Sequence, residues 1–152
     1  MTMTLEFALE MRLSLGARVH IPVAVGYTRG AVLIADGTFA GPGIRGRIVP
    51  GSGGDFPLVW PDGGGRFESQ YLLETDDGAR ILKRSTGLRH APPEVVAALL
   101  AGEPVDPARY YMRMTPRFEA PEGKYDWLNR TLFVGVGARH PAGSVFRFWK
   151  VV

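Results

Sequence analysis

The stretch FALEMRLSL, residues 7–15, alternates apolar and polar side chains along most of its length. Successive side chains of a β-strand point to opposite faces of the sheet, so residues two apart share a face. One face then carries Phe7, Leu9, Met11, Leu13 and Leu15, and the other carries Glu10, Arg12 and Ser14. This pattern predicts an antiparallel strand with one buried face and one face in water.

The same period of two recurs along the chain, interrupted by glycine, proline and aspartate at regular intervals. Asp77-Gly78 predicts a tight hairpin turn, because such a turn needs residues that tolerate positive φ, and Asp36-Gly37 predicts a second one. The chain is therefore predicted to be all-β. Further strands are expected at residues 19–25, 30–35, 44–49, 66–75, 79–84, 110–115, 127–136 and 145–152.

One segment lacks this alternation and has the pattern of a helix. APPEVVAALLAGEP, residues 91–104, has proline at the first helical position, Glu94 in the first turn and Gly102 just past the end. We expect a short helix from about Pro93 to Ala101 that packs on the sheet or plugs a barrel end. The predicted fold is a single compact antiparallel β-barrel domain over residues 1–152, of about eight to ten strands, with a two-sheet sandwich as the competing architecture.

Composition narrows the classes of function. The 152 residues contain no cysteine, which removes thiolate chemistry and is compatible with a cytoplasmic location. The histidines, His20, His90 and His140, form no ligand-spaced pair, so we expect no metal site. No run approaches the roughly 18 consecutive apolar residues of a membrane helix, so we expect no membrane partner. The net charge of +3 is scattered among acidic residues, which argues against nucleic-acid binding.

Several stretches, in order and with similar spacing, resemble domain-of-unknown-function family 3237. They are GTFAGPGIRGRIVPG (37–51), the segment around Asp55, DGGGRFESQYLLETDDGARI (62–81), YYMRMTPRFEAP (110–121) and YDWLNRTLFVGVG (125–137). The resemblance implies a compact antiparallel β-barrel and little about activity. The family usually has Asp and Arg where this chain has Glu68 and Gln70, and Trp where it has Phe56. The missing arginine implies a different ligand, or a different role for that strand.

Two strands offer candidate catalytic side chains. In residues 110–119, alternation places Arg113 on one face and Met112 and Met114 on the other. With an apolar lumen Arg113 is a surface residue, and with a partly polar lumen it is a buried cation that pairs with or binds an anion. In residues 67–75, Tyr71 lies on the apolar face, either as a general acid or as a core tyrosine with a satisfied hydroxyl.

The stretch YDWLNRTLFVGVG offers candidate binding residues. Read as a strand, it puts Trp127 and Asn129 on one face, together with Thr131 and Phe133. The Asn129 amide either holds a ligand oxygen or ties down a neighbouring loop backbone. Trp127 is a candidate for stacking on a ligand.

The segment PGSGGDFPLVWPDGGG, residues 50–65, is too rich in glycine and proline to predict a strand or helix, and too long for a hairpin connection. A phosphate loop would need a lysine and a hydroxyl residue followed by a helix, and the chain supplies neither here. We interpret it as a loop at the rim of the barrel, with Asp55 as a general base or as a turn cap.

These residues support two hypotheses about a small apolar or aromatic molecule held in the barrel lumen or mouth. The first is a cofactor-independent enzyme of lyase, isomerase or cyclase type, in which Tyr71 or Asp55 moves a proton. Arg113 and Asn129 would stabilise developing oxyanion charge, and Trp127 would stack on the ligand. The second is a non-catalytic binding or carrier protein. The chain has no nucleotide fingerprint, and a homo-oligomer stays open.

Overall fold

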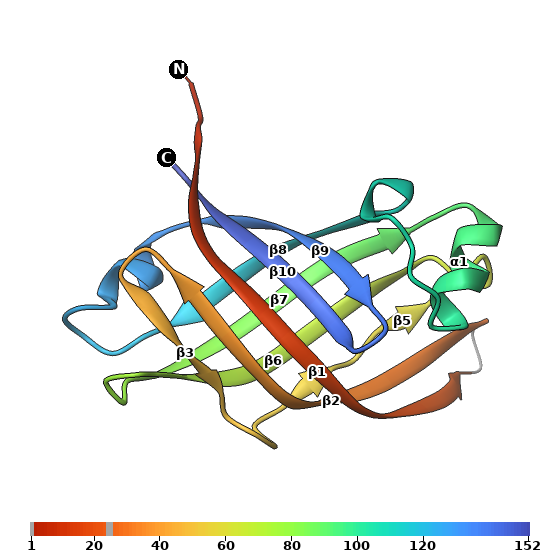
Figure 1. Ribbon diagram of the computed structural model, residues 1–152, viewed down its shortest axis with the longest axis horizontal. Coiled ribbons are helices and arrows are strands. Elements are labelled where there is room, and N and C mark those ends of the chain that lie inside the picture. The colour runs from red at the N-terminus through yellow and green to blue at the C-terminus, as the bar shows by residue number, and fades with distance from the viewer. Residues whose placement is uncertain (1, 24–25) are drawn as a thin grey trace.

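The computed structural model describes residues 2–23 and 26–152, which form ten strands, one α-helix and two short 3-10 helices (Figure 1). The strands are β1 (Leu5–Val23), β2 (Tyr27–Gly41), β3 (Ile44–Ile48), β4 (Gly54–Asp55), β5 (Leu58–Val59), β6 (Gly65–Thr75), β7 (Arg80–His90), β8 (Tyr111–Glu119), β9 (Phe133–His140) and β10 (Gly143–Val151). The helices are α1 (Pro93–Leu100), η1 (Pro107–Arg109) and η2 (Asp126–Arg130).

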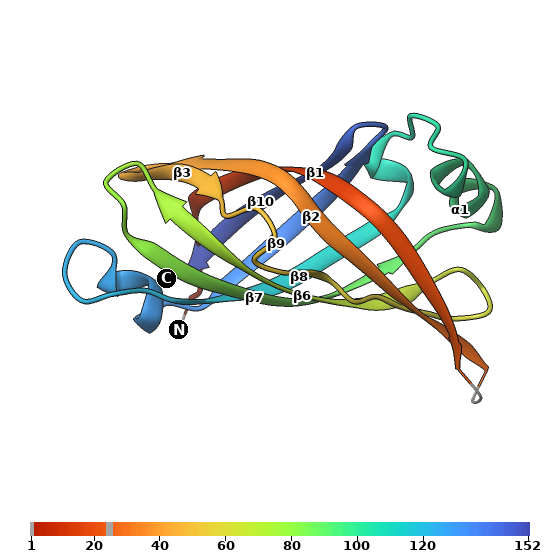
Figure 2. The same cartoon turned by 90° about the horizontal axis from the view of Figure 1, so that it is seen from below.

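The strands close into an antiparallel barrel, which confirms the predicted fold class over the sandwich. The order around the wall is β1, β10, β9, β8, β7, β6, β3 and β2, and β2 pairs again with β1. Figures 1 and 2 show the strands wrapping around one common interior. Closure matters because an open sheet would leave unpaired backbone groups along its two edges.

The strands predicted at residues 7–15 and 19–25 belong to one long strand, β1, with residues 24–25 outside the described part of the chain, and β2 is longer than the predicted 30–35. The chain was expected to turn at Asp36-Gly37, but both residues lie inside β2, where they pair with Ser14 and Leu13 of β1. This hairpin prediction is wrong because Gly37 serves close packing: a Cβ atom there would lie 2.6 Å from the Arg12 carbonyl oxygen. The hairpin at Asp77-Gly78 is confirmed, and Gly78 has the positive φ of 86° that the turn requires.

The predicted inner face of β1 is correct at Leu9, Met11 and Leu13, which are buried. Phe7 lies outside and packs edge-on against Trp149, with ring centroids 6.2 Å apart. The register of β1 against β10 shifts between Phe7 and Leu9. Such a bulge moves one residue out of phase, so the simple alternation fails at this end.

The segment before β9 is not the strand expected at residues 127–136. Residues 126–130 form η2, and β9 begins only at Phe133. Side-chain hydrogen bonds to backbone stabilise the turn. Asn129 Oδ1 accepts from the Ala120 N–H and Asn129 Nδ2 donates to the Ala120 carbonyl oxygen, while Thr131 Oγ1 donates to the Trp127 carbonyl oxygen. These side-chain bonds to backbone compete with a strand ladder, which explains the correction.

The prediction that residues 50–65 form a loop without strands is also corrected. This segment is part of the barrel wall and contains two short strands, β4 and β5. β4 pairs with both β2 and β6, and so does β5, which fills the gap between these strands. Gly54 allows this insertion, since a Cβ atom there would lie 2.5 Å from the Val32 carbonyl oxygen. The glycines therefore serve the close approach of three backbones.

The two ends of the barrel differ (Figure 1). The η2 segment and the β6–β7 turn lie at one end, and α1 lies at the other. The predicted helix is confirmed with its end one residue earlier, and Val95 buries its side chain. In residues 2–23 and 26–152, no helix has the length and apolar character needed to cross a membrane.

Candidate functional site

A cavity of about 280 Å³ opens inside the barrel at the α1 end, where Leu100 of the helix forms part of its lining. Much of its wall is apolar and includes Phe67, Met112, Met114 and Phe146. The volume lies near the lower end of the range for small-molecule sites, which fits a compact organic ligand. Its polar lining comes chiefly from Asp55, Ser69, Tyr71, Lys83 and three arginines.

Strand register brings four of these polar groups together. Asp55 on β4 pairs with Ser69 on β6, and Tyr71, two residues further on, pairs with Lys83 on β7. Side chains directly opposite or two apart on one face of a sheet are neighbours. The four side chains therefore form one polar cluster on the inner wall, which we call the Asp55–Lys83 cluster: Asp55, Ser69, Tyr71 and Lys83.

Lys83 is the cation of this cluster and is only 2% exposed. Its Nζ donates to Ser69 Oγ at 2.9 Å and to Tyr71 Oη at 3.1 Å. The ammonium also lies 4.6 Å from the centre of the Tyr71 ring. Burial lowers the pKa of Lys83 to about 7, although the nearby Asp55 charge raises it in part. Near neutral pH the amine is thus present in both its charged and its neutral form.

Asp55 is the carboxyl group of the cluster. Burial raises its pKa to about 6, while the charges of Lys83, Arg139 and Arg89 oppose this increase. Its Oδ1 atom is buried and accepts no hydrogen bond from the described residues. A buried acceptor without a partner is costly, so this oxygen is free to take a proton or a hydrogen bond from a ligand.

Tyr71 lies inside the barrel, as its predicted face requires, and is 1% exposed. Burial, together with the Asp55 charge, raises the pKa of its phenol above the ordinary value. The ring therefore stays neutral, and its oxygen accepts the hydrogen bond from Lys83. A neutral phenol still has its own O–H to donate. Its role in catalysis stays a prediction.

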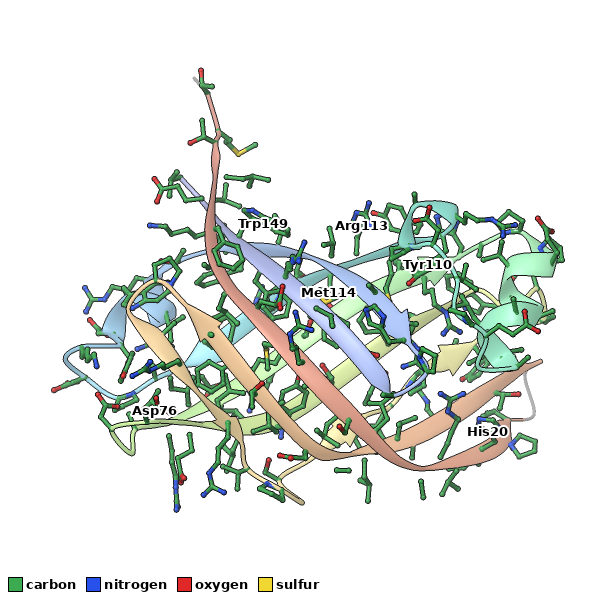
Figure 3. The ribbon with its side chains drawn as sticks, viewed as in Figure 1. His20, Asp76, Tyr110, Arg113, Met114 and Trp149 are labelled. Atoms are coloured by element: carbon green, nitrogen blue, oxygen red, sulfur yellow. The ribbon has the colours of Figure 1, made fainter. Side chains whose placement is uncertain are left out.

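Arg113 does not face this cavity. It lies exposed on the outside of β8, where its guanidinium is 5.1 Å from the Tyr111 ring centre and donates to the Met112 carbonyl oxygen. Figure 3 shows it at the upper side of the barrel, far from His20 near the cavity mouth. Met112 and Met114 line the lumen instead. The structure thus selects the apolar-lumen alternative for this strand.

Trp127 and Asn129 lie in η2, at the end of the barrel opposite α1 (Figure 1). The Asn129 amide already has hydrogen-bond partners: the backbone N–H and carbonyl oxygen of Ala120, and Asp126 Oδ1. Trp127 packs against Phe133, with ring centroids 5.9 Å apart. Neither residue lines the cavity, so the geometry does not bring them to Asp55 and Tyr71.

Sequence reasoning missed Lys83 and the three cavity arginines, Arg18, Arg89 and Arg139. A signal for Lys83 was present, because it lies two residues after the apolar Ile81 in a predicted strand and so shares its face. Among the described residues, no group of three or more histidine, aspartate or glutamate side chains is placed to hold a metal ion.

Known proteins similar to this chain cover nearly all of it. A UPF0311 protein from Clostridium acetobutylicum is 33% identical over 151 residues, which are 96% of this chain and 95% of the relative. The crystal structure of a conserved protein of unknown function from Rhodopseudomonas palustris has a TM-score of 0.91 and 35% identity, covering 99% of this chain and 98% of that one.

Two further crystal structures have the same fold. A beta-barrel like protein from Acinetobacter baumannii has a TM-score of 0.85 at 33% identity and covers 99% of this chain and 97% of its own. An enzyme from Penicillium herquei has a TM-score of 0.74 at 21% identity, covering 99% and 95%, and shows the fold alone. The model of one family, described as "Protein of unknown function (DUF3237)", matches residues 3–151. This chain therefore belongs to the DUF3237 family, as its sequence motifs predicted.

Proposed function

We propose that this protein is a cofactor-independent acid–base enzyme of lyase, isomerase or cyclase type, acting on a small organic molecule in the barrel cavity. The observation that carries the proposal is the Asp55–Lys83 cluster. A carboxyl with a raised pKa and an amine with a lowered pKa face one enclosed, largely apolar space. Perturbed groups of opposite type in a cavity are typical of proton-transfer sites.

In the proposed reaction Asp55 is the base. At neutral pH its carboxyl is mostly ionised, because its pKa is about 6, and Oδ1 has no other partner in the described structure. It removes a proton from an acidic C–H or O–H of the substrate, leaving an enolate or alkoxide. Lys83 in its ammonium form, or the Tyr71 phenol, donates to that oxygen and stabilises its negative charge.

The later steps need no oxidant or reductant. Returning the proton to another atom gives an isomer, and expelling a leaving group gives a lyase reaction. Attack of the anion on a second group of the same molecule gives a ring. In each case the electron pair from the broken bond to hydrogen forms a bond within the substrate, and Asp55 later gives the proton back.

The comparisons support the proposal through the fold only. The Penicillium herquei protein, which shares the barrel at 21% identity, is described as an enzyme. One fold hosts many functions, so this likeness does not identify a reaction. Arg113, Trp127 and Asn129 lie outside the cavity and are not part of the proposed machinery.

The test uses the molecule that co-purifies with the wild-type protein, identified by mass spectrometry. It is returned to the purified protein in D₂O, and exchange of hydrogen for deuterium or formation of a product is followed. We expect wild type to catalyse exchange or conversion. Asp55→Asn should bind the molecule without exchanging it, because an amide cannot take the proton.

Matched variants separate chemistry from binding. Asp36→Asn changes an exposed aspartate on β2 and should leave the exchange rate at the wild-type value. Tyr71→Phe and Lys83→Met test the proton donors of the cluster. If wild type binds the molecule without exchanging or altering it, and the cluster variants change affinity alone, the carrier hypothesis replaces the enzyme.

A further inference from the structure

Three arginines from separate strands line the same cavity: Arg18 of β1, Arg89 of β7 and Arg139 of β9. Arg139 lies at the α1 end, since its backbone N–H donates to Tyr110 Oη at 2.8 Å and Figure 3 shows Tyr110 at that end. Its Nη1 also donates to Ser144 Oγ at 3.0 Å, which fixes the direction of the guanidinium.

These arginines differ from most of those on the outer wall. Nine of the twelve other arginines form ion pairs with carboxylates, whereas within residues 2–23 and 26–152 none of Arg18, Arg89 and Arg139 does. Among the described cavity-lining residues, Asp55 supplies the only carboxyl. The cavity thus carries an excess of positive charge that the described residues do not neutralise.

The arginine side chains lie close enough to repel one another. Burial, and next the charges of Arg18 and Arg89, lower the pKa of Arg139 to about 10. Burial also lowers the pKa of Arg89, again with the Arg18 charge as the next cause. Arg89 and Arg139 are half-buried and Arg18 is exposed at the cavity. Gathering cations without anionic partners, two of them half-buried, destabilises a fold, so the arrangement indicates a missing anion.

We propose that Arg18, Arg89 and Arg139 bind the carboxylate of the substrate, whose apolar or aromatic body extends along Phe67, Met112 and Phe146 toward the Asp55–Lys83 cluster. This inference names the substrate class, a small apolar carboxylic acid. It rests on the proposed function for the statement that the other end of the substrate reacts at the Asp55–Lys83 cluster. A guanidinium fork matches the two oxygens of a carboxylate, and this pairing is strongest where water is excluded. The apolar wall accounts for the rest of the molecule.

The test compares two probes of nearly equal shape, 2-naphthoate and the neutral 2-naphthamide, with inorganic phosphate as a third. Binding to the wild-type protein is measured by calorimetry and by thermal stabilisation, at low and high salt. We expect 2-naphthoate to bind at least roughly tenfold more tightly than 2-naphthamide, the factor that one charge-assisted hydrogen bond supplies. We expect this preference to fall as salt screens the arginines.

Variants assign the preference to the arginines. Arg139→Gln and Arg89→Met should each weaken 2-naphthoate binding by roughly tenfold to a hundredfold with little effect on 2-naphthamide, while Arg139→Lys should keep part of the preference. Arg117→Gln, on the exposed face of β8, is the control and should bind like wild type. Arg89→Met without ligand should melt at a higher temperature than wild type, which a structural arginine would not allow.

Equal binding of acid and amide, no stabilisation by the acid at about 10 mM, or a preference that survives both arginine variants would overturn the inference. Stabilisation by inorganic phosphate as large as that by 2-naphthoate would overturn the part played by the apolar body. None of these outcomes depends on turnover. If acid binding depends on the arginines but no molecule is ever converted, the inference stands as a binding site and the proposed enzyme fails.

Discussion

Lys83 should make the stability of this protein increase with pH across the neutral range. Its pKa falls from 10.5 in the unfolded chain to about 7 in the folded barrel, chiefly because the ammonium is buried. Between these two values the unfolded state binds more protons than the folded state, so raising the pH favours folding. The change that tests this is Lys83→Met, which keeps a long flexible side chain but removes the titrating group.

The size of the effect follows from the proton difference. At about pH 7 the two states differ by about half a proton, and by about pH 9 they differ by nearly one. Each full proton changes the free energy of unfolding by about 1.4 kcal/mol per pH unit, so the increase from about pH 7 to about pH 9 sums to about 2 kcal/mol. Asp55 adds nothing in this window, because its carboxyl is ionised in both states above its pKa of about 6.

The assay is urea unfolding followed by tryptophan fluorescence at several pH values between these limits. Wild type should gain stability with pH, and Lys83→Met should show no such gain, because loss of this amine also lets the pKa of Asp55 rise. Lys150→Met, which removes an ion pair with Glu6, serves as a control and should retain the wild-type increase. A flat or falling wild-type profile, or an increase that persists in Lys83→Met, would refute the argument that burial holds this amine near neutrality.

Four other outcomes follow from the structure. The rate of the proposed reaction should peak between the pKa values of about 6 for Asp55 and about 7 for Lys83, and Lys83→Met should remove the alkaline limb of the pH–rate profile. Gly54→Ala should lower the free energy of unfolding by about 1–3 kcal/mol in urea titrations, because its Cβ atom would meet the β2 backbone. Asp77, which accepts hydrogen bonds from Lys124 and Tyr125, has a pKa held well below its usual range, first by the Lys124 contact. Asp77→Asn should therefore lower the melting temperature at neutral pH, and the difference from wild type should shrink below about pH 4, where the wild-type carboxylate begins to lose its advantage. Tyr71→Phe should retain binding of the co-purified molecule and slow its exchange in D₂O, and an unchanged exchange rate would leave Lys83 as the proton donor.

The regular alternation of apolar and polar residues predicted many of the barrel strands and their inner faces. In β6 the predicted inner face, which includes Phe67, Tyr71 and Thr75, is the buried one. The same rule, extended along β7, would have placed Lys83 and Arg89 inside with Ile81. Lysine and arginine are mostly exposed in folded proteins, so residue type alone gives no reason to place them in a lumen. The alternation along β7 therefore indicated two inward-facing cations, Lys83 and Arg89, that their residue types alone did not.

The remaining differences arose where the period is interrupted or where contacts are distant. Register shifts in β1 between Ser14 and Arg18 break the alternation, so no pattern could place Arg18 at the cavity. The Asn129 bonds to Ala120 join positions nine residues apart and turn an expected strand into η2. Arg113 matched a family motif, but its neighbours Met112 and Met114 took the interior because the lumen is largely apolar.

The β4 segment has a consequence for how a ligand enters. It joins the wall through only two residues, Gly54 and Asp55, between the much longer strands β2 and β6. Short ladders open at a lower free-energy cost than long ones, so amide hydrogens at residues 53–59 should exchange faster than those of the β6–β7 ladder. The proposed base, Asp55, would then lie on a wall segment that opens locally, and a ligand would enter the cavity there while the longer strands of the barrel stay paired.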